Sequence, residues 1–293
     1  MGKSSFQIFI ENLVLSSLTI LKVLLLSKFF IKFPQRTKCN NCIILGNGPS
    51  LNKVISNEIK LLSKNNLFCV NYFVYTDYFS ILKPQYYVIN APELWGENVL
   101  KKVKNNSEKL FSAIGKKTKW EMILFLPYSA KKNQIWRNYL GDNNFIKICY
   151  FNTTPVEGFS ILNNFFFKHG FGMPRPHNVL IPSLILSIGL NYRNIYLLGI
   201  DHSWLKEISV DKNNNVFINQ KHFYDENSSE PKAMHKGGIG KRRLHEVLQK
   251  YVYSFRGYFE IKKFADKKNI NIYNCTRDSY VDAFERKNLS ELN

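Results

Sequence analysis

The stretch Cys42-Ile43-Ile44-Leu45-Gly46 is a short apolar run that ends at a glycine, and Asn47-Gly48-Pro49-Ser50-Leu51 follows it directly. Such a run, bounded by a turn signal, is typical of a strand that is buried on both faces of a parallel sheet. Six similar runs recur, at 67–71, 86–90, 122–126, 146–150, 195–199 and 270–274. Segments of helical length separate most of them, at 51–64, 98–113, 130–140, 157–168, 178–190 and 241–268. This alternation predicts an α/β fold with a mainly parallel sheet flanked by helices.

An apolar segment, residues 6–33, precedes the first predicted strand. Its longest uncharged part runs only from Asn12 to Leu21, whereas a helix that spans a bilayer needs about 20 apolar residues. Residues 1–38 carry six basic side chains and one acidic one, which favours an anionic membrane surface. We therefore predict a membrane-interfacial helix and linker at 1–38 and a globular domain at 39–293. The alternative is a helix that packs on that domain or on a second copy of the chain, as in a homo-oligomer.

The composition limits the class of protein and its partners. The chain has 293 residues, of which 45% are hydrophobic, so it can form a sizeable core and is not globally disordered. Its 41 Lys and Arg residues exceed its 22 Asp and Glu residues by 19, which indicates a polyanionic partner. No helix-turn-helix, zinc-finger or RNP-like motif accompanies the charge, so we predict no nucleic acid. Cys39 and Cys42 lack a second pair of ligands for zinc, and we predict no metal site.

The residues that follow the predicted strands are the candidate binding residues, because ligands of parallel sheets bind outside the carboxyl ends of the strands. In the turn at 46–51 the glycines allow close approach of a ligand, and Ser50 can cap the helix whose free N–H groups would meet a phosphate. Asn71 and Asn90 end the next two strands, where amides can bind a sugar hydroxyl or a base edge. Asp201 follows the run at 195–199 and could bind a ligand hydroxyl, orient a base or cap the turn that comes next in the chain.

A long polar segment, 205–240, is predicted to be a lid-like loop over this edge of the sheet. It contains His235 next to two glycines, and a histidine near its normal pKa is a suitable general base at neutral pH. His202 and His222 are the rival candidates. Arg242 lies in the basic run 241–243, which could hold a phosphate leaving group or face solvent.

Five motifs give the chain a resemblance to the bacterial sialyltransferases of glycosyltransferase family 42. They are Ile-Leu-Gly-Asn-Gly-Pro-Ser-Leu (44–51), Cys-Val-Asn-Tyr-Phe (69–73), Tyr-Val-Ile-Asn-Ala-Pro (87–92), Ile-Tyr-Leu-Leu-Gly-Ile-Asp (195–201) and Ile-Tyr-Asn-Cys-Thr-Arg-Asp-Ser (272–279). The resemblance covers roughly residues 42–285. It implies a Rossmann-like, metal-independent, inverting transferase without a cofactor, which uses a CMP-activated sugar acid at the cytoplasmic face of the bacterial inner membrane. The acceptor would be a glycan or glycolipid in surface polysaccharide or lipooligosaccharide synthesis.

The same resemblance implies roles for particular residues. His235 would be the catalytic base, and Asp201 belongs to the same catalytic region. The donor would contact residues of the first turn, the two strand-end asparagines and the start of a later helix: Asn47, Gly48, Pro49, Ser50, Asn71, Asn90 and Asn178. The family's leaving-group tyrosine is replaced by His202-Ser203-Trp204, so Tyr224 and Arg242 are the candidates for that role. The turn at 46–50 also resembles the pterin pyrophosphokinase-like group, which includes flagellin-glycosylation factors, and a nucleotide-using protein of that kind is the alternative.

Overall fold

The structure is a computed structural model that describes residues 3–29, 31, 33–34, 39–96, 101–219, 232–233 and 241–291, with only the backbone of Lys102 and Lys232. Within these ranges, eight strands form one sheet in the order β11-β10-β6-β1-β2-β3-β4-β5, and every neighbouring pair is parallel. Their bounds are β1 Asn41–Leu45, β2 Asn66–Val70, β3 Tyr86–Val88, β4 Met122–Pro127, β5 Ile146–Phe151, β6 Asn194–Leu198, β10 Asn271–Asn274 and β11 Glu285–Arg286. The predicted α/β fold is confirmed.

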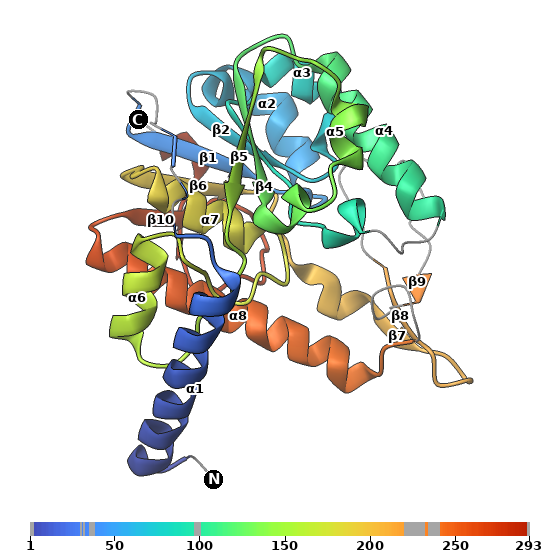
Figure 1. Ribbon diagram of the computed structural model, residues 1–293. Helices are drawn as coiled ribbons and strands as arrows, with labels where there is room; N and C mark the ends of the chain where they lie inside the picture. The colour runs from blue at the N-terminus through green and yellow to red at the C-terminus, as the bar shows by residue number, and fades with distance from the viewer. Residues whose placement is uncertain are drawn as a thin grey trace.

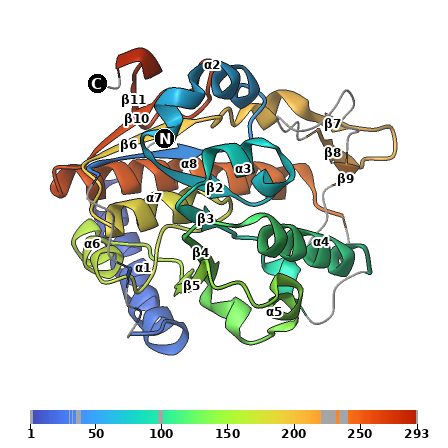
Figure 2. The ribbon, with the colours of Figure 1, turned by 90° about the horizontal axis from the view of Figure 1, so that it is seen from above.

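Helices cover both faces of this sheet, as Figures 1 and 2 show. One layer contains α2 to α5, and the other contains α6, α7 and α8. The bounds are α2 Leu51–Ser63, α3 Tyr78–Leu82, α4 Lys101–Lys117, α5 Ile135–Leu140, α6 Ser160–Lys168, α7 Leu180–Gly189 and α8 Leu244–Lys267. Each helix expected from the sequence is present within a few residues, and α3 was not foreseen. Five residues are too few to show helical periodicity in a sequence.

Two hydrophobic cores lie on the two faces of the sheet because successive side chains of a strand point to opposite faces. In β1, Cys42 and Ile44 enter the core beneath α7 and α8, whereas Ile43 and Leu45 enter the core beneath α2 to α5. All four side chains are fully buried. Burial on both faces explains why the strand reads as a continuous apolar run.

Among the described residues of the segment 205–240, which are 205–219 and 232–233, some form regular secondary structure. Three short antiparallel strands, β7 Ile208–Val210, β8 Val216–Ile218 and β9 Lys232–Ala233, form a second sheet. Val216 and Ile218 pack against Val247 and Tyr251 of α8. The sequence interpretation missed these strands because they are only two or three residues long.

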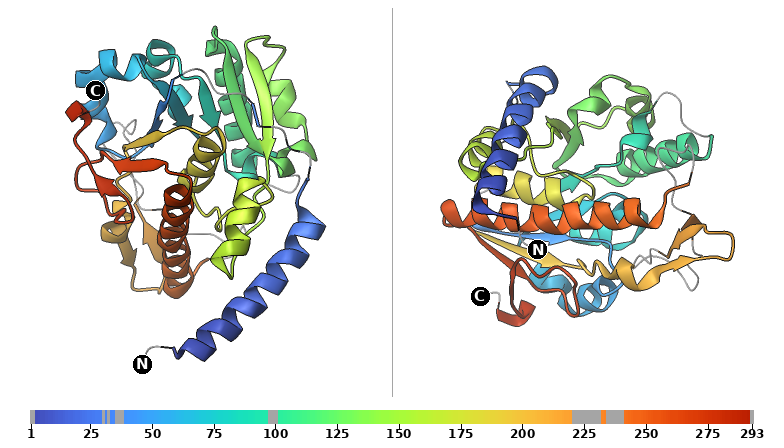
Figure 3. Two further views of the ribbon diagram at one scale, coloured as in Figure 1. Left: turned by 90° about the vertical axis from the view of Figure 1, so that its left-hand side faces the viewer. Right: turned by 90° about the horizontal axis from the view of Figure 1, so that it is seen from below.

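Helix α1, Ser5–Leu26, projects from the body of the domain, and its N-terminal end lies far from the sheet (Figures 1 and 3). It is long and apolar enough to cross a membrane, by length and composition alone. Ser4 caps it through a capping box with Gln7. The helix ends at Leu26, earlier than the predicted limit at residue 33, because the Ser27 hydroxyl bonds to Thr154 and Phe171 of the body.

Candidate active site at the carboxyl ends of the strands

The turn that follows β1 is held tightly against the end of β6. The N–H of Gly46 donates to the Leu198 carbonyl at 2.8 Å, and the N–H of Gly48 donates to the Gly199 carbonyl at 2.9 Å. A Cβ atom on Gly46 would collide with the Gly199 carbonyl, and one on Gly48 would collide with the Asp201 carboxylate. Glycine is required at both positions because the two strand ends approach so closely.

Asp201 contacts the start of α2 rather than open solvent. Its Oδ1 accepts the Ser50 N–H at 3.2 Å, and its Oδ2 accepts the Ser50 hydroxyl at 2.8 Å. Burial raises the pKa of the Asp201 carboxyl above its ordinary value, while the bonds from Ser50 act in the opposite direction. The carboxylate therefore caps α2. The sequence had suggested that Asp201 caps the turn after it and that Ser50 caps α2, but the Ser50 side chain makes no capping bond there.

Most backbone N–H groups of this turn donate hydrogen bonds to other atoms of the protein. Those of Gly46, Gly48, Ser50 and Leu51 all have partners within the turn or at the end of β6. A ligand at this turn would instead meet Asn47 and the exposed Pro49. Asn47 donates from Nδ2 to the Val70 carbonyl at 3.2 Å, while its buried Oδ1 accepts no hydrogen bond from the described residues. A buried acceptor of this kind is suited to a hydroxyl or amino group of a ligand.

Asn71 and Asn90 lie next to each other, as their positions after β2 and β3 predict. Asn71 has the left-handed φ of 46°, and its Oδ1 accepts the N–H of Asn90 at 3.4 Å. Asn90 in turn donates from Nδ2 to the Pro176 carbonyl at 3.0 Å. Within the described residues, the Asn71 amide NH₂ and the Asn90 amide oxygen make no hydrogen bond. One donor and one acceptor therefore remain for a ligand at adjacent strand ends.

Asn178 has a different position from these two asparagines. Its Oδ1 accepts the N–H groups of Leu180 and Ile181 at the start of α7, and its Nδ2 donates to the Tyr258 hydroxyl at 2.8 Å. Because both ends of the amide have partners in the protein, Asn178 supports the local structure beside Asn90.

Tyr258 continues this chain of hydrogen bonds to His202, with its hydroxyl 2.7 Å from His202 Nε2. The tautomer of His202 decides which of the two groups donates in this hydrogen bond. Burial lowers the pKa of His202 to about 3. The buried His202, a rival candidate for the catalytic base, is thus part of the supporting structure on the α8 side of the sheet.

A group of basic side chains that acts on His177 was not recognised from the sequence. His177 directly follows Pro176, and its ring lies 5.6 Å from that of Tyr253 on α8. Burial lowers the pKa of His177, and the positive charges of Lys250, Arg175 and Arg242 lower it further. Burial and Arg242 also lower the pKa of Lys250. From the sequence, only Arg242 was a candidate for binding phosphate. The others were missed because α8 and residues 175–178 are far apart in the sequence and come together only in the folded chain.

The end of β6 is supported from the C-terminal part of the chain. The Thr276 hydroxyl accepts the N–H of Ile200 at 3.0 Å, the Ser279 hydroxyl donates to the Ile200 carbonyl, and the Tyr280 N–H donates to the Asp201 carbonyl at 2.9 Å. Beside them, a cavity of about 660 Å³ opens at the ends of β10 and β11, lined by residues that include Thr276, Asp278 and Lys287. The predicted site residues do not line this cavity.

The structure therefore brings four of the predicted residues together as two pairs, and the two pairs lie near each other. Asp201 and Ser50 meet at the start of α2, Asn71 and Asn90 meet at the ends of β2 and β3, and Asn47 reaches between them to Val70. His235 and Tyr224, like the third histidine His222, lie outside the described residues, so their predicted roles stay predictions. No group of three or more His, Cys, Asp or Glu side chains that could hold a metal occurs among the described residues.

Comparisons with known proteins place the chain in no family. No protein-family model matches it, and no curated protein matches it. Among solved structures, it is similar to the MAf glycosyltransferase from Magnetospirillum magneticum AMB-1, with a TM-score of 0.48 and 10% identical residues. That match covers 100% of this chain and 40% of the glycosyltransferase chain. A likeness this distant carries no argument about the reaction.

Proposed function

We propose that the chain is a glycosyltransferase that transfers a sugar from a nucleotide-activated donor bound at the ends of β1, β2 and β3. The observation that carries this proposal is the adjacency of Asn71 and Asn90, which offer an amide NH₂ and an amide oxygen next to the buried acceptor of Asn47. Uncharged donors and acceptors in this arrangement suit the hydroxyl groups and base edge of a nucleotide.

The basic group that acts on His177 supports a donor with a phosphate leaving group. As the bond to the sugar breaks, negative charge develops on the departing phosphate, and fixed positive charges stabilise it. The positive charges of Arg242 and Lys250 lower the pKa of His177, which follows the Pro176 carbonyl that Asn90 binds, while the Glu93 carboxylate raises the pKa of Lys250. These basic side chains fit a transfer that needs no metal ion.

The finer proposal is a sialyltransferase-like, inverting reaction with a CMP-activated sugar acid. A base takes the proton from the acceptor hydroxyl, the acceptor oxygen bonds to the anomeric carbon, and the bond from that carbon to the phosphate oxygen breaks to release CMP. His235 is the proposed base. A glycan or glycolipid acceptor and the cytoplasmic face of the inner membrane complete this proposal.

Calorimetric titration with CMP, CDP, and ATP with Mg²⁺ tests the donor class. We expect CMP to bind, and we expect Asn71→Ala and Asn90→Ala each to weaken binding about tenfold, as loss of a buried hydrogen bond would. Asn144→Ala is the matched control, because Asn144 is exposed before β5. Binding of ATP with Mg²⁺ but not of CMP would favour the pyrophosphokinase-like alternative.

A turnover assay with CMP-sugars tests the base. His235→Ala should abolish transfer while CMP binding persists. His177→Ala should reduce both sugar transfer and CMP binding, because it removes a side chain from the region proposed to bind the phosphate. Full turnover in His235→Ala would overturn the assignment of the base without affecting the proposed donor site.

A further inference from the structure

Helix α1 packs on the domain through its polar side chains, the reverse of the usual arrangement in a soluble protein. Ser16, Thr19, Val23 and Ser27 are its buried residues and face the body. Thr19 is fully buried and exchanges two hydrogen bonds with the backbone of Glu157, at 2.8 and 3.0 Å. Ser16 accepts the N–H of Phe159 at 2.9 Å.

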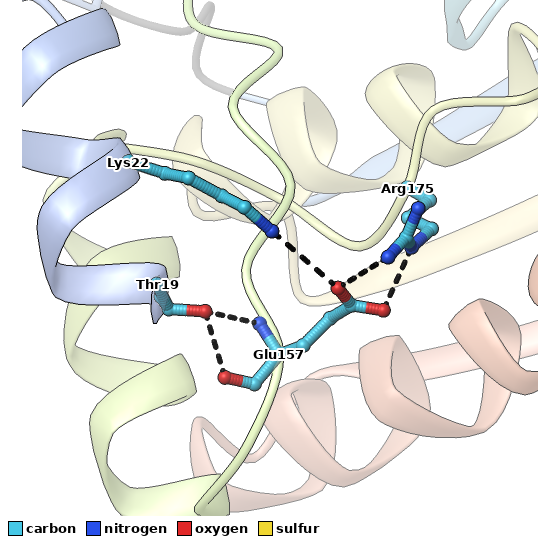
Figure 4. A network of polar contacts seen from close by, with 4 residues as sticks. All are labelled: Thr19, Lys22, Glu157 and Arg175. Atoms are coloured by element: carbon cyan, nitrogen blue, oxygen red, sulfur yellow. Dashed lines mark hydrogen bonds and ion pairs between the residues drawn. The ribbon is translucent and has the colours of Figure 1, made fainter. Parts of the chain in front are cut away.

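An ion-pair network fixes the same contact (Figure 4). Glu157 binds the Arg175 guanidinium through both carboxylate oxygens, at 2.7 and 2.8 Å, and lies 3.9 Å from the ammonium group of Lys22 on α1. The C-terminal half of α1 is therefore attached to the body along several turns.

Exposed apolar residues occur around most of α1, and Leu18 and Leu25 lie on the same side as Glu11 and Lys22. Phe6, Leu13 and Leu24 are spaced by 7 and 11 residues, or about two and three helical turns, so they lie on one side. They are 72%, 47% and 63% exposed. Gln7, Glu11 and Lys22 are spaced by 4 and 11 residues and lie along a different side.

Helix α6 adds exposed apolar side chains beside α1 (Figures 1 and 3). Ile161 is 81% exposed and Phe165 is 50% exposed. Aromatic contacts join α1 and the segment after it to the segments that flank α6, with Phe9 5.6 Å from Phe159 and Phe29 5.0 Å from Phe171. The apolar surface thus includes residues of both helices.

The part of α1 that extends beyond its attachment is too short to cross a bilayer. From Ser5 to Ser16 the helix rises about 17 Å, roughly half of the ~30 Å hydrocarbon core. A span by this part would also bury Glu11, whereas an in-plane helix keeps such a side chain at the headgroups. Lys28 after α1 and Lys168 at the end of α6 are exposed, and the chain carries a net charge of +19, which complements anionic lipids.

We infer that α1 and α6 together insert into a single leaflet of an anionic membrane, with α1 lying in the interface and fixed to the domain. The lipid face consists of Phe6, Leu13, Leu24, Ile161 and Phe165. Because α1 cannot rotate independently of the body, insertion fixes the orientation of the whole domain to the bilayer. This inference does not depend on the proposed reaction.

Flotation with vesicles of 30% phosphatidylglycerol in phosphatidylcholine tests the lipid face. We expect Leu13→Asp and Ile161→Asp each to lower the vesicle partition coefficient at least tenfold. Val210→Asp should bind like the wild type, because Val210 is 49% exposed on β7, away from α1. Pure phosphatidylcholine vesicles should bind more weakly. Loss of vesicle binding in Leu13→Asp but not in Ile161→Asp would overturn the inference that α6 inserts together with α1.

A topology measurement distinguishes one leaflet from a span. The full chain with an N-terminal protease-cleavable tag is bound to sealed vesicles from outside, and added protease should remove the tag. Protection of the tag would show that α1 crosses the bilayer and would overturn the inference. A second result would also overturn the inference. In it, the chain does not bind vesicles but forms a dimer without lipid, and light scattering shows that Leu13→Asp and Ile161→Asp dissociate this dimer.

Discussion

Asp201 binds Ser50 with both oxygens of its carboxylate, one to the backbone N–H and one to the hydroxyl. This pair joins the end of β6 to the start of α2, two elements about 150 residues apart in the sequence. The contact makes Asp201 a structural residue of the candidate site, and its loss should be visible in stability as well as in ligand binding.

Asp201→Asn should lower the free energy of unfolding by about 2 kcal/mol, because an amide cannot accept both bonds from Ser50. Ser50→Ala removes only the hydroxyl bond and should cost about 1 kcal/mol. Urea unfolding measures both, with the exposed Asp282→Asn as the control. Wild-type stability of Asp201→Asn together with lost nucleotide binding would instead place the carboxylate on the ligand.

The buried His202 should make stability depend on pH. Its pKa is about 3 in the folded chain and about 6.5 when unfolded, so the unfolded chain binds the extra proton between these values. The stabilisation that the neutral His202 contributes to the folded chain is therefore fully present above pH 6.5, and it is lost progressively as the pH falls toward 3. The wild type should lose up to about 5 kcal/mol over this range, as measured by urea unfolding at successive pH values.

His202→Gln should show a shallower slope between pH 6.5 and 4 than the wild type. His169→Gln, which changes an exposed histidine, should keep the wild-type slope. Equal slopes in all three proteins would mean that His202 titrates normally and is not held neutral by burial.

Thr19 should contribute to holding α1 on the domain. Thr19→Val keeps the shape of the side chain but leaves the Glu157 N–H and carbonyl without their partner, which should cost about 1–3 kcal/mol. Ser17→Ala is the control, because the exposed Ser17 hydroxyl bonds only to Leu13 within the helix. Limited proteolysis between α1 and β1 should become faster in Thr19→Val alone, and equal rates would contradict the contact.

Lys250 should contribute to phosphate binding at the candidate site. Lys250→Met should weaken CMP binding about tenfold and leave the much weaker binding of cytidine unchanged, because only CMP carries the phosphate charge. Lys119→Met, an exposed lysine away from the strand ends, is the matched control. Equal losses for CMP and cytidine would show that Lys250 acts on the shape of the site and not on the phosphate.

The sequence predicted most of the main sheet, since strands such as β1 and β6 are buried on both faces and read as continuous apolar runs. It also predicted that Asn71 and Asn90 lie together, because neighbouring parallel strands end at one edge. It could not predict that Asp201 caps α2, since an acid after a strand is compatible with either role. His177 was missed because its basic neighbours come from α8, and no local pattern links them.

The support that Thr276, Ser279 and Tyr280 give to the end of β6 has a consequence for biosynthesis. A ribosome releases α1 long before it releases these three residues, so a nascent chain can reach a lipid surface while the Gly199–Asp201 end of β6 still lacks its support. Under the proposed function, nucleotide binding then requires that synthesis has passed Tyr280. A chain cleaved before Thr276 should keep α1 and lose nucleotide binding.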